Sequence, residues 1–532
     1  MIMGVYVNPG NNGFKELIKS GNYIDKTSMI SYVNSVLNTR NKEICFTRPR
    51  RFGKTCAADM LCAYYSCGCD SEDLFQNLKI ADDPSFEKHL NQYPVIYFGL
   101  IRFLADRTKD RKQVVKTIQN VLNQELKKEY PEADIHVENS LSDNLLYLSS
   151  MIQKKFIIII DEWDMIFREE SSDIALQEEY VDFLRTLFRS SETSQYLACA
   201  YMTGILPIIK YNTQSALSDF REYTMINPGY LGEYIGFTEE DVKKVCGMYP
   251  EADFEEMRRW YDGYYIKRIG HIYCPNSVMQ AAPFGEYKNY WAQTSAFESL
   301  KMYIEMNFDG LKDSILDMLN DREVSINVNS FQNNLNQINR KDDVLTVLVH
   351  LGYLAYDEMR KTVRIPNLEI RQNFLNAIED GTNRDFIDRI KRSDEVIDAT
   401  IHRDETRLAE LIQEVHDNRP PRYYNNEQAL RYVILNAYDY TPMCWYTVFE
   451  ELSSGQGFSD MMLIPQKGTG KPALIIELKY DQSPEKAIEQ IRDKHYMSYL
   501  EKQHYSGEVY LIGIGYDSKK KEHACRIVSE TV

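Results

Sequence analysis

Long apolar runs and export signals are missing from this sequence. No stretch approaches the ~20 consecutive apolar residues that a membrane-spanning helix needs, so we expect no membrane partner. The opening segment, MIMGVYVNPGNNGFKEL, has neither the basic flank nor the apolar core of a signal peptide. We therefore expect a cytoplasmic protein.

Cysteine and histidine patterns that hold metals are also missing. The ten cysteines are scattered and form no C-x-x-C pair. The only tight cluster, CGC at residues 67–69, has no nearby histidine that would complete a zinc site. The nine histidines are dispersed, without the spacing of a metal site or an activated nucleophile. We interpret the cysteines as reduced, buried thiols.

Positive charge is in the minority. Lysine and arginine number 62 against 79 aspartates and glutamates, which gives a net charge of −17 at pH 7. This balance argues against a protein that coats nucleic acid non-specifically, but it leaves room for an enzyme with a local basic groove. A chain of 532 residues is too long for one core, so two to four domains are expected.

Apolar strands alternate with helical segments in the first half of the chain. Strands are predicted at 43–47, 94–100, 155–161 and 197–204, with amphipathic helices at 111–130 and 175–192. This alternation predicts an α/β fold, a parallel sheet with helices on both faces. The continuous run FIIII fits a central strand that is buried on both sides.

The pattern changes near residues 232 and 382, which predicts three regions: 1–232, 233–382 and 383–532. The middle region is mostly helical. Its segment 344–379 reads helix, hairpin, helix, an order that resembles a winged helix. The last region opens with a charged helical stretch and continues as a second α/β segment.

The segment TRPRRFGKT ends like the phosphate-binding loop G-x-x-x-x-G-K-[ST], but Arg48 stands at its first glycine position. It lies between an apolar strand and a helical pattern, the context in which Lys54 would reach the β- and γ-phosphates and the Thr55 hydroxyl would ligate Mg²⁺. Arg50 and Arg51 either face phosphate oxygens or contact a neighbouring domain. The predicted nucleotide-binding residues are Arg50, Arg51, Phe52, Gly53, Lys54 and Thr55.

The run FIIIIDEWD places Asp161 at the end of a buried strand, with Glu162 next. Asp161 would hold Mg²⁺, and Glu162 would polarise the attacking water of ATP hydrolysis. The alternative is a strand that merely emerges into an acidic turn. Thr203, which ends the next strand, would lie beside Asp161 if the strands are neighbours, and its hydroxyl would bind the γ-phosphate or the water. The alternative is a polar residue that simply caps the strand.

The segment 457–480 predicts a hairpin-like strand pair with three ionisable residues. Asp460 opens the first strand, whereas Glu477 and Lys479 project from the same face of the second. Asp460 and Glu477 can share a divalent cation while Lys479 orients or activates water beside a phosphodiester. The alternative is an exposed strand that carries E-x-K by chance.

The motifs YIDKT, TRPRRFGKT, IIIIDEWD, MTGILPI and WYDGYY resemble the bacterial AAA-ATPase-like proteins related to archaeal-type ATPases, over about residues 1–280. The resemblance implies a P-loop fold with an extra strand between the two Walker motifs, and ATP binding with the roles given above. It also implies that a loop without the first glycine is the family's own pattern. Arg189 is the one candidate arginine finger, so a homo-oligomer is left open.

The D…E-x-K pattern resembles the PD-(D/E)XK nuclease superfamily, over about residues 385–532. The resemblance implies that Glu427 is the acidic residue of the first core helix and Gln490 a polar residue of a later one; either could instead be a solvated helix position. Two functions follow. The first is a Mg²⁺- and ATP-dependent nuclease acting on nucleic acid, DNA rather than RNA. The second is a nucleotide-dependent switch with an inactive nuclease-like domain.

Overall fold

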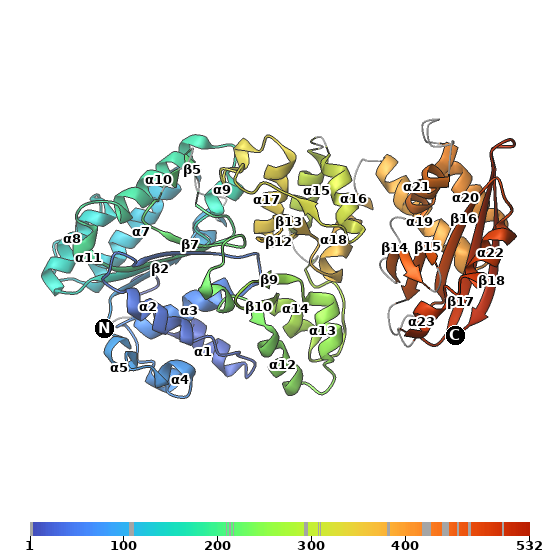
Figure 1. The fold of residues 1–532 in the computed structure, drawn as a ribbon. Helices are drawn as coiled ribbons and strands as arrows, with labels where there is room; N and C mark the ends of the chain where they lie inside the picture. Colours follow the sequence, from blue (N-terminus) through green and yellow to red (C-terminus); the bar gives the residue numbers. More distant parts are fainter. Residues whose placement is uncertain are drawn as a thin grey trace. The chain divides into compact units, whose positions relative to one another are not determined.

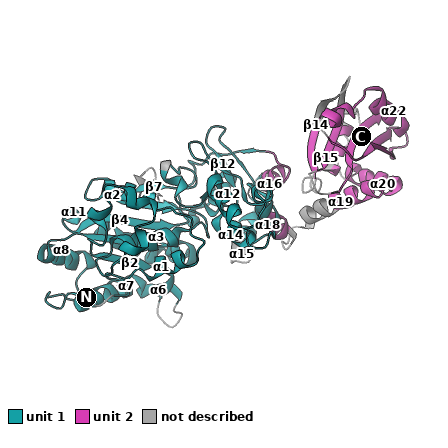
Figure 2. Cartoon of the chain, turned by 90° about the horizontal axis from the view of Figure 1, so that it is seen from below, with its two compact units in different colours: residues 1–311, 323–373 teal, residues 312–322, 374–532 magenta. Residues whose placement is uncertain are grey.

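The computed structural model divides into two compact units: residues 1–311 with 323–373 (unit 1), and 312–322 with 374–532 (unit 2) (Figure 2). It describes residues 4–105, 111–208, 210–211, 214–215, 217–291, 296–306, 308, 310–379, 384–417, 427–438, 446–454, 457–465, 470–502 and 505–532. None of the helices in these ranges is long and apolar enough to cross a membrane. The domain boundaries near 232 and 382 stay predictions.

Unit 1 contains a five-stranded parallel sheet in the order β2-β3-β4-β1-β7. Its strands are β1 (Glu43–Thr47), β2 (Val95–Gly99), β3 (Phe156–Asp161), β4 (Leu197–Gly204) and β7 (Arg221–Tyr223). β3 lies between β2 and β4, and all six of its residues are buried. The predicted parallel α/β fold with a buried central strand is therefore confirmed, and β4 separates β1 from β3 in the sheet.

Helices cover both faces of this sheet (Figure 1). One face packs against α7 (Val114–Glu129), α8 (Leu141–Ile152) and α10 (Ile174–Phe188). The other face packs against α3 (Lys54–Tyr65), beside α1 (Asn12–Lys19) and α2 (Ser28–Val36). The first turns of α8 and α10 are fixed by their caps, because Ser140 and Asp173 each accept a backbone N–H three residues on.

The remainder of unit 1 includes two three-stranded antiparallel sheets. The first is formed by β8 (Phe237–Thr238), β10 (Gly270–Tyr273) and β9 (Tyr264–Ile266), and shares a core with α12 (Glu239–Met248), α13 (Phe254–Tyr261) and α14 (Pro275–Ala281). The second is formed by β11 (Val324–Ser325), β13 (Thr362–Arg364) and β12 (Ala355–Asp357), with α17 (Lys341–Leu351) before the β12–β13 hairpin and α18 (Leu368–Glu379) after it. Helix, hairpin and helix thus follow in the predicted order; a winged helix stays a prediction.

Unit 2 is built on a five-stranded sheet in the order β14-β15-β16-β17-β18. The strands are β14 (Tyr446–Ser454), β15 (Gly457–Pro465), β16 (Ala473–Tyr480), β17 (Glu508–Asp517) and β18 (Glu522–Thr531); only the β16–β17 pair is parallel. One face packs against α19 (Arg384–Ile401), α20 (Glu405–Asp417) and α21 (Glu427–Ala437), the other against α22 (Pro484–Asp493). The second α/β segment is therefore confirmed. Asp460 lies inside β15 rather than at its start, because the strand already begins at Gly457.

Candidate functional site

A cavity of about 830 Å³ lies where β1 ends and α3 begins. All six predicted nucleotide-binding residues line it, together with Glu162. The rest of the lining includes aromatic and apolar side chains, among them Tyr23, Ile24, Met60, Tyr234, Phe237 and Met279. A polar loop beside an apolar wall, in a cavity of this size, suits a ligand with a charged end and a flat apolar end.

Gly53 sets the shape of the loop. Its φ of +90° is a left-handed conformation that glycine adopts without strain, and Lys54 begins α3 directly after it. Because Gly53, Lys54 and Thr55 all line the cavity, the N-terminus of a 12-residue helix borders it. Such a helix end favours negative charge, since its first N–H groups have no partner inside the helix.

Lys54 is almost fully buried, and its Nζ donates to the Pro49 carbonyl at 2.8 Å. Burial lowers the pKa of Lys54 to about 8, against the opposing effect of the carboxylates of Asp161, Asp164 and Glu162. At a pKa of about 8 most Lys54 side chains stay protonated near pH 7, and a bound polyanion would stabilise that charged form further.

The two kinds of arginine in the loop point to different places. Arg48 is 1% exposed, donates to the Thr47 carbonyl at 2.9 Å and lies 4.8 Å above the Phe46 ring, so it belongs to the core and not to the cavity lining. Arg51 lines the cavity and also donates to the Tyr290 carbonyl at 2.8 Å. A contact of Arg51 with another segment of unit 1 is therefore observed; its role toward phosphate stays a prediction.

Asp161 joins three parts of the site. The Thr55 hydroxyl donates to Asp161 Oδ2 at 2.7 Å, and the Thr203 hydroxyl donates to Oδ1. The second contact exists because β3 and β4 are neighbours in the sheet. A hydroxyl and a carboxylate side by side next to the loop are oxygen ligands of the kind that Mg²⁺ takes, with water filling its remaining positions.

Glu162 and Asp164 share one partner, Arg168, which the sequence analysis did not single out. Arg168 Nε lies 2.9 Å from Asp164 Oδ2 and its Nη2 lies 3.3 Å from Glu162 Oε2. Asp164 is fully buried and also accepts the backbone N–H groups of Ile205 and Leu206, which follow β4. The arginine thus connects the cavity carboxylate to the segment after Thr203. Its i,i+4 spacing from Asp164 was the available sequence signal.

The YIDKT motif lies at the cavity, where Tyr23, Ile24 and Lys26 are part of the lining. Asp25 accepts the backbone N–H groups of Thr27 and Lys79, so it joins the YIDKT segment to the segment at residue 79. Lys26 lines the cavity, forms a 2.5 Å ion pair with Asp241 and donates to the Glu233 carbonyl. Lys26 therefore fixes the 233–241 segment against the N-terminal part of the cavity wall.

A second constellation forms in unit 2. Met461 of β15 lies opposite Ile476 of β16, so the next pair in the same register is Asp460 and Glu477. Asp460 Oδ2 accepts the Leu478 N–H at 2.9 Å, and Lys479 Nζ lies 3.4 Å from Glu477 Oε1. The structure therefore brings Asp460, Glu477 and Lys479 together, as the hairpin interpretation requires.

Helices α22 and α21 reach this constellation from the two faces of the sheet. Gln490 of α22 donates to Glu477 and lies 3.2 Å from the buried Tyr496 hydroxyl. Arg431 of α21 donates to the Asp460 carbonyl at 3.2 Å, and its Nε lies 3.8 Å from Asp460 Oδ1. Glu427 begins α21 one turn before Arg431, but its side chain lies outside the described residues. Sequence reasoning missed Arg431 and Tyr496, since neither interrupts an apolar pattern.

Burial, followed by the negative charge of Asp460, raises the pKa of Glu477 to about 8. Two neighbouring carboxylates repel each other when both are ionised. A divalent cation between them offsets this repulsion, so both can carry their charge. Within the described ranges no three His, Cys, Asp or Glu side chains gather as a metal cluster. Asp460 and Glu477 thus offer two oxygen ligands, which suits Mg²⁺ because that ion keeps several waters.

Comparison with family models finds matches in two separate parts of the chain. Residues 9–213 match the family described as "Predicted AAA-ATPase", and residues 425–524 match the PD-(D/E)XK nuclease superfamily. The first match contains the 47–55 loop, Asp161 and Thr203; the second contains Asp460, Glu477, Lys479 and Gln490.

The chain was also compared with curated proteins and with solved structures. None of the curated proteins compared with the chain matches it. Among matching solved structures is "Structure of the Aeropyrum Pernix ORC2 protein (ADPNP-ADP complexes)", 13% identical, with 65% of this chain and 91% of that chain covered and a TM-score of 0.22. At this TM-score the likeness carries no argument about the fold.

Proposed function

Since the chain carries a predicted AAA-ATPase domain and a PD-(D/E)XK nuclease superfamily domain, we propose that it binds and hydrolyses ATP and cleaves phosphodiester bonds of nucleic acid, with Mg²⁺ at both sites. The observation that carries the proposal is that two separate oxygen-ligand pairs form: Thr55 with Asp161, and Asp460 with Glu477. DNA is the favoured substrate over RNA. A cytoplasmic location and a homo-oligomer stay predictions.

Different residues of the cavity bind the phosphates, the base and the metal of ATP. The helix end at Gly53 and the Lys54 ammonium bind the phosphates, Arg50 and Arg51 add charge at the rim, and the aromatic wall receives the base. Thr55 and Asp161 would hold Mg²⁺, which supplies charge neutralisation for the phosphoryl group in transit. Glu162 takes up a proton of the attacking water, and Thr203 orients that water or the γ-phosphate.

For nucleic acid, Asp460 and Glu477 would hold the metal, which supplies Lewis-acid activation of the scissile phosphate. Lys479 orients the attacking water or stabilises the charge that develops on the phosphate oxygens. Gln490 keeps the Glu477 carboxylate in place through the hydrogen bond that the structure contains. Glu427 is proposed to assist from the start of α21.

A nucleotide-dependent switch with an inactive nuclease-like domain is the second candidate. The observation that favours it is the net charge of −17, which repels a polyanionic substrate. The paired arrangement of Asp460, Glu477 and Lys479 favours the nuclease, because three ionisable groups on a largely buried strand pair are costly to keep without a ligand.

Cleavage of labelled DNA and RNA, with Mg²⁺ or Mn²⁺ and with or without ATP, separates the two candidates. We expect wild type to cut DNA and Lys479→Ala to lose about a hundredfold or more in rate. Lys486→Ala, an exposed lysine on α22 that pairs with Glu489, is the matched control. Absence of cleavage by wild type under every condition would favour the nucleotide-dependent switch over the nuclease.

Phosphate release from ATP tests the first site. Lys54→Ala should weaken nucleotide binding, whereas Glu162→Gln should retain binding and lose turnover, because the two residues act on different steps. Both variants turning over ATP at the wild-type rate would remove the ATPase assignment. The measurement is independent of unit 2 and therefore of the nuclease assay.

A further inference from the structure

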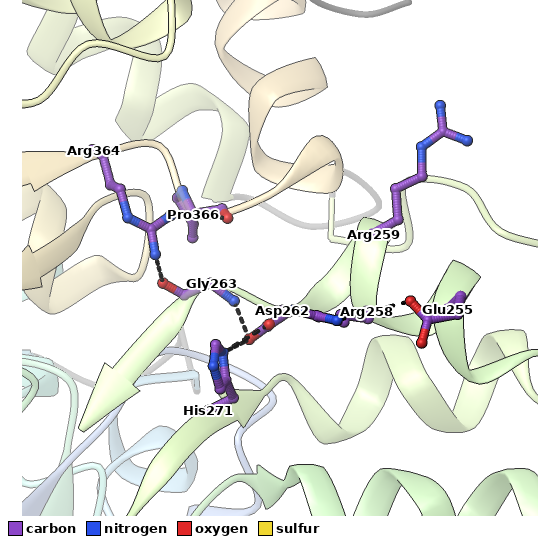
Figure 3. A pocket seen from close by; sticks show the side chains of 8 residues that line it. All are labelled: Glu255, Arg258, Arg259, Asp262, Gly263, His271, Arg364 and Pro366. Carbon is purple, nitrogen blue, oxygen red and sulfur yellow. Dashed lines mark hydrogen bonds and ion pairs between the residues drawn. The ribbon is translucent and has the colours of Figure 1, made fainter. Parts of the chain in front are cut away.

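A second pocket in unit 1 shares no lining residue with the nucleotide cavity. It has a volume of about 360 Å³ and lies where the end of α13, the strand β10 and the end of β13 meet (Figure 3). Its lining is almost entirely charged: Glu255, Arg258, Arg259, Asp262, Gly263, His271, Arg364 and Pro366. Asp262 and Gly263 belong to the WYDGYY motif, for which the proposed activities have no use.

The acidic groups of the pocket are already engaged. The two oxygens of Asp262 lie 2.9 and 2.8 Å from His271 Nδ1, and the Gly263 N–H also donates to this carboxylate. Nε2 of His271 makes no hydrogen bond to another described residue. Glu255 lies 3.8 Å from Arg258 and pairs with it loosely.

Arg364 is held in a different way. Its Nη2 donates to the Gly263 carbonyl at 2.9 Å and its Nη1 to the Pro366 carbonyl at 3.4 Å. No described carboxylate lies within ion-pair distance of it, so its charge is fixed in position by neutral acceptors and is not neutralised by an acid. A guanidinium held in this way is preorganised to receive an oxyanion.

The backbone that carries these groups is rigid. Gly263 has a φ of +127°, and a Cβ there would come within 2.0 Å of the Pro366 carbonyl oxygen. The Asn367 amide donates to the Asp262 carbonyl at 2.8 Å and joins the same two segments. The WYDG turn is therefore locked against residues 364–367, and His271 and Arg364 are held with it (Figure 3).

We propose that this pocket binds a phosphate group, without contact to a base. Of the three guanidinium groups in its lining, Arg258 pairs loosely with Glu255 and Arg259 with Glu256, whereas Arg364 has no described carboxylate within ion-pair distance, in a chain whose overall charge is −17. Among the described residues that line the pocket none is Phe, Tyr or Trp, so its one aromatic ring is that of His271, which already contacts Asp262 and Tyr265. The ligand chemistry is an oxyanion recognised by arginine, either free phosphate or pyrophosphate or one phosphate of a nucleic-acid backbone.

The site needs neither ATP hydrolysis nor strand cleavage, so its test avoids both. Full-length protein carrying Lys54→Ala, which weakens phosphate binding at the loop, is kept in EDTA. In one arm, anisotropy reports binding of a fluorescein-labelled 20-nucleotide single strand and of its duplex across a salt series. In the other arm, calorimetry measures sodium phosphate and sodium pyrophosphate.

Arg258→Gln and Arg364→Gln are added singly to that background. Arg185→Gln is the matched control, because Arg185 makes the same i,i+3 pair, with Asp182, on a helix far from the pocket in sequence. We expect each pocket variant to weaken binding about tenfold in one of the two arms, which identifies the source of the phosphate. For the oligonucleotide the salt slope should fall by about 1.

Arg258 and Arg259 in the last turn of α13 also complement the helix dipole. If this structural role were their only one, Arg258→Gln would leave phosphate and oligonucleotide binding unchanged. Arg258→Gln is exposed and should fold normally, so it tests the site even if Arg364→Gln is destabilised. Unchanged affinity and salt slope for Arg258→Gln in both arms would overturn the proposal. So would an equal loss in the Arg185→Gln control.

Discussion

Asp161 and Asp164 are three residues apart and have different surroundings. Asp161 accepts hydroxyl groups from Thr55 and Thr203 at the edge of the nucleotide cavity. Asp164 is fully buried and accepts two backbone N–H groups and the Arg168 guanidinium. At the residue scale, then, one acid faces the proposed chemistry and the other holds the protein around it.

Removing the guanidinium from this buried pair should cost stability. We expect Arg168→Gln to lower the free energy of unfolding of unit 1 by about 3 kcal/mol, because Asp164 would keep a buried charge without its cationic partner. Urea unfolding followed by circular dichroism measures the change. Glu162→Gln should cost less than about 1 kcal/mol, since Glu162 is a quarter exposed. Equal losses for the two variants would contradict the division of roles.

At the scale of elements, α13 and β9 depend on a single turn residue. Gly263→Ala places a methyl group within 2.0 Å of the Pro366 carbonyl in a left-handed conformation, so we expect a loss of about 3 kcal/mol or more. Gly247→Ala in α12 is the control, because nothing lies within 4 Å of its Cβ and alanine favours a helix. The control should gain up to about 1 kcal/mol. Thermal unfolding compares the two; a harmless Gly263→Ala would refute the packing argument.

Glu369 joins α18 to α14 and to the loop before α15 (Ala296–Glu305). It accepts the Ser277 hydroxyl and the backbone N–H groups of Tyr290 and Trp291. Burial raises its pKa from 4.5 to about 7, against the effect of these donors and of Arg51. The folded state therefore binds more protons than the unfolded state between these two values.

The proton that the folded state holds on Glu369 makes the protein more stable at low pH than at high pH. The stabilisation linked to Glu369 is fully present below pH 4.5 and is lost as the pH rises through about 7, up to about 3 kcal/mol. Glu369→Gln should remove this part of the pH dependence, whereas Glu286→Gln, an exposed glutamate beside Lys288, should leave it intact. Urea unfolding at pH 5 and pH 8 measures both. Equal slopes for wild type and Glu369→Gln would contradict the buried proton.

At the scale of the whole molecule, the division into two units has a measurable consequence. Every residue that lines the nucleotide cavity belongs to unit 1. Calorimetry should therefore show two unfolding transitions, of which a non-hydrolysable ATP analogue with Mg²⁺ raises only one, by several degrees. Lys54→Ala should abolish that shift. A single transition, or an equal shift of both, would show that the units unfold as one.

Local patterns predicted much of the molecule. The apolar runs at 43–47, 155–161 and 197–204 become β1, β3 and β4, because a strand that is buried on both faces is apolar at nearly every position. The E-x-K strand and its partner Asp460 likewise follow from polar residues that interrupt an apolar pattern. Whether an arginine points to a phosphate or into the core does not follow from such a pattern, as Arg48 and Arg51 show.

The amino-acid sequence by itself determined the two α/β folds and the residue types at their strand ends, since periodicity and burial are properties of neighbouring positions. Only the tertiary structure decided which of these residues meet. Thr203 reaches Asp161 through sheet order, Arg431 reaches Asp460 from a helix 29 residues away in the chain, and Arg364 reaches Gly263 across 101 residues. Those contacts join segments distant in the chain, and no local pattern encodes such a distance.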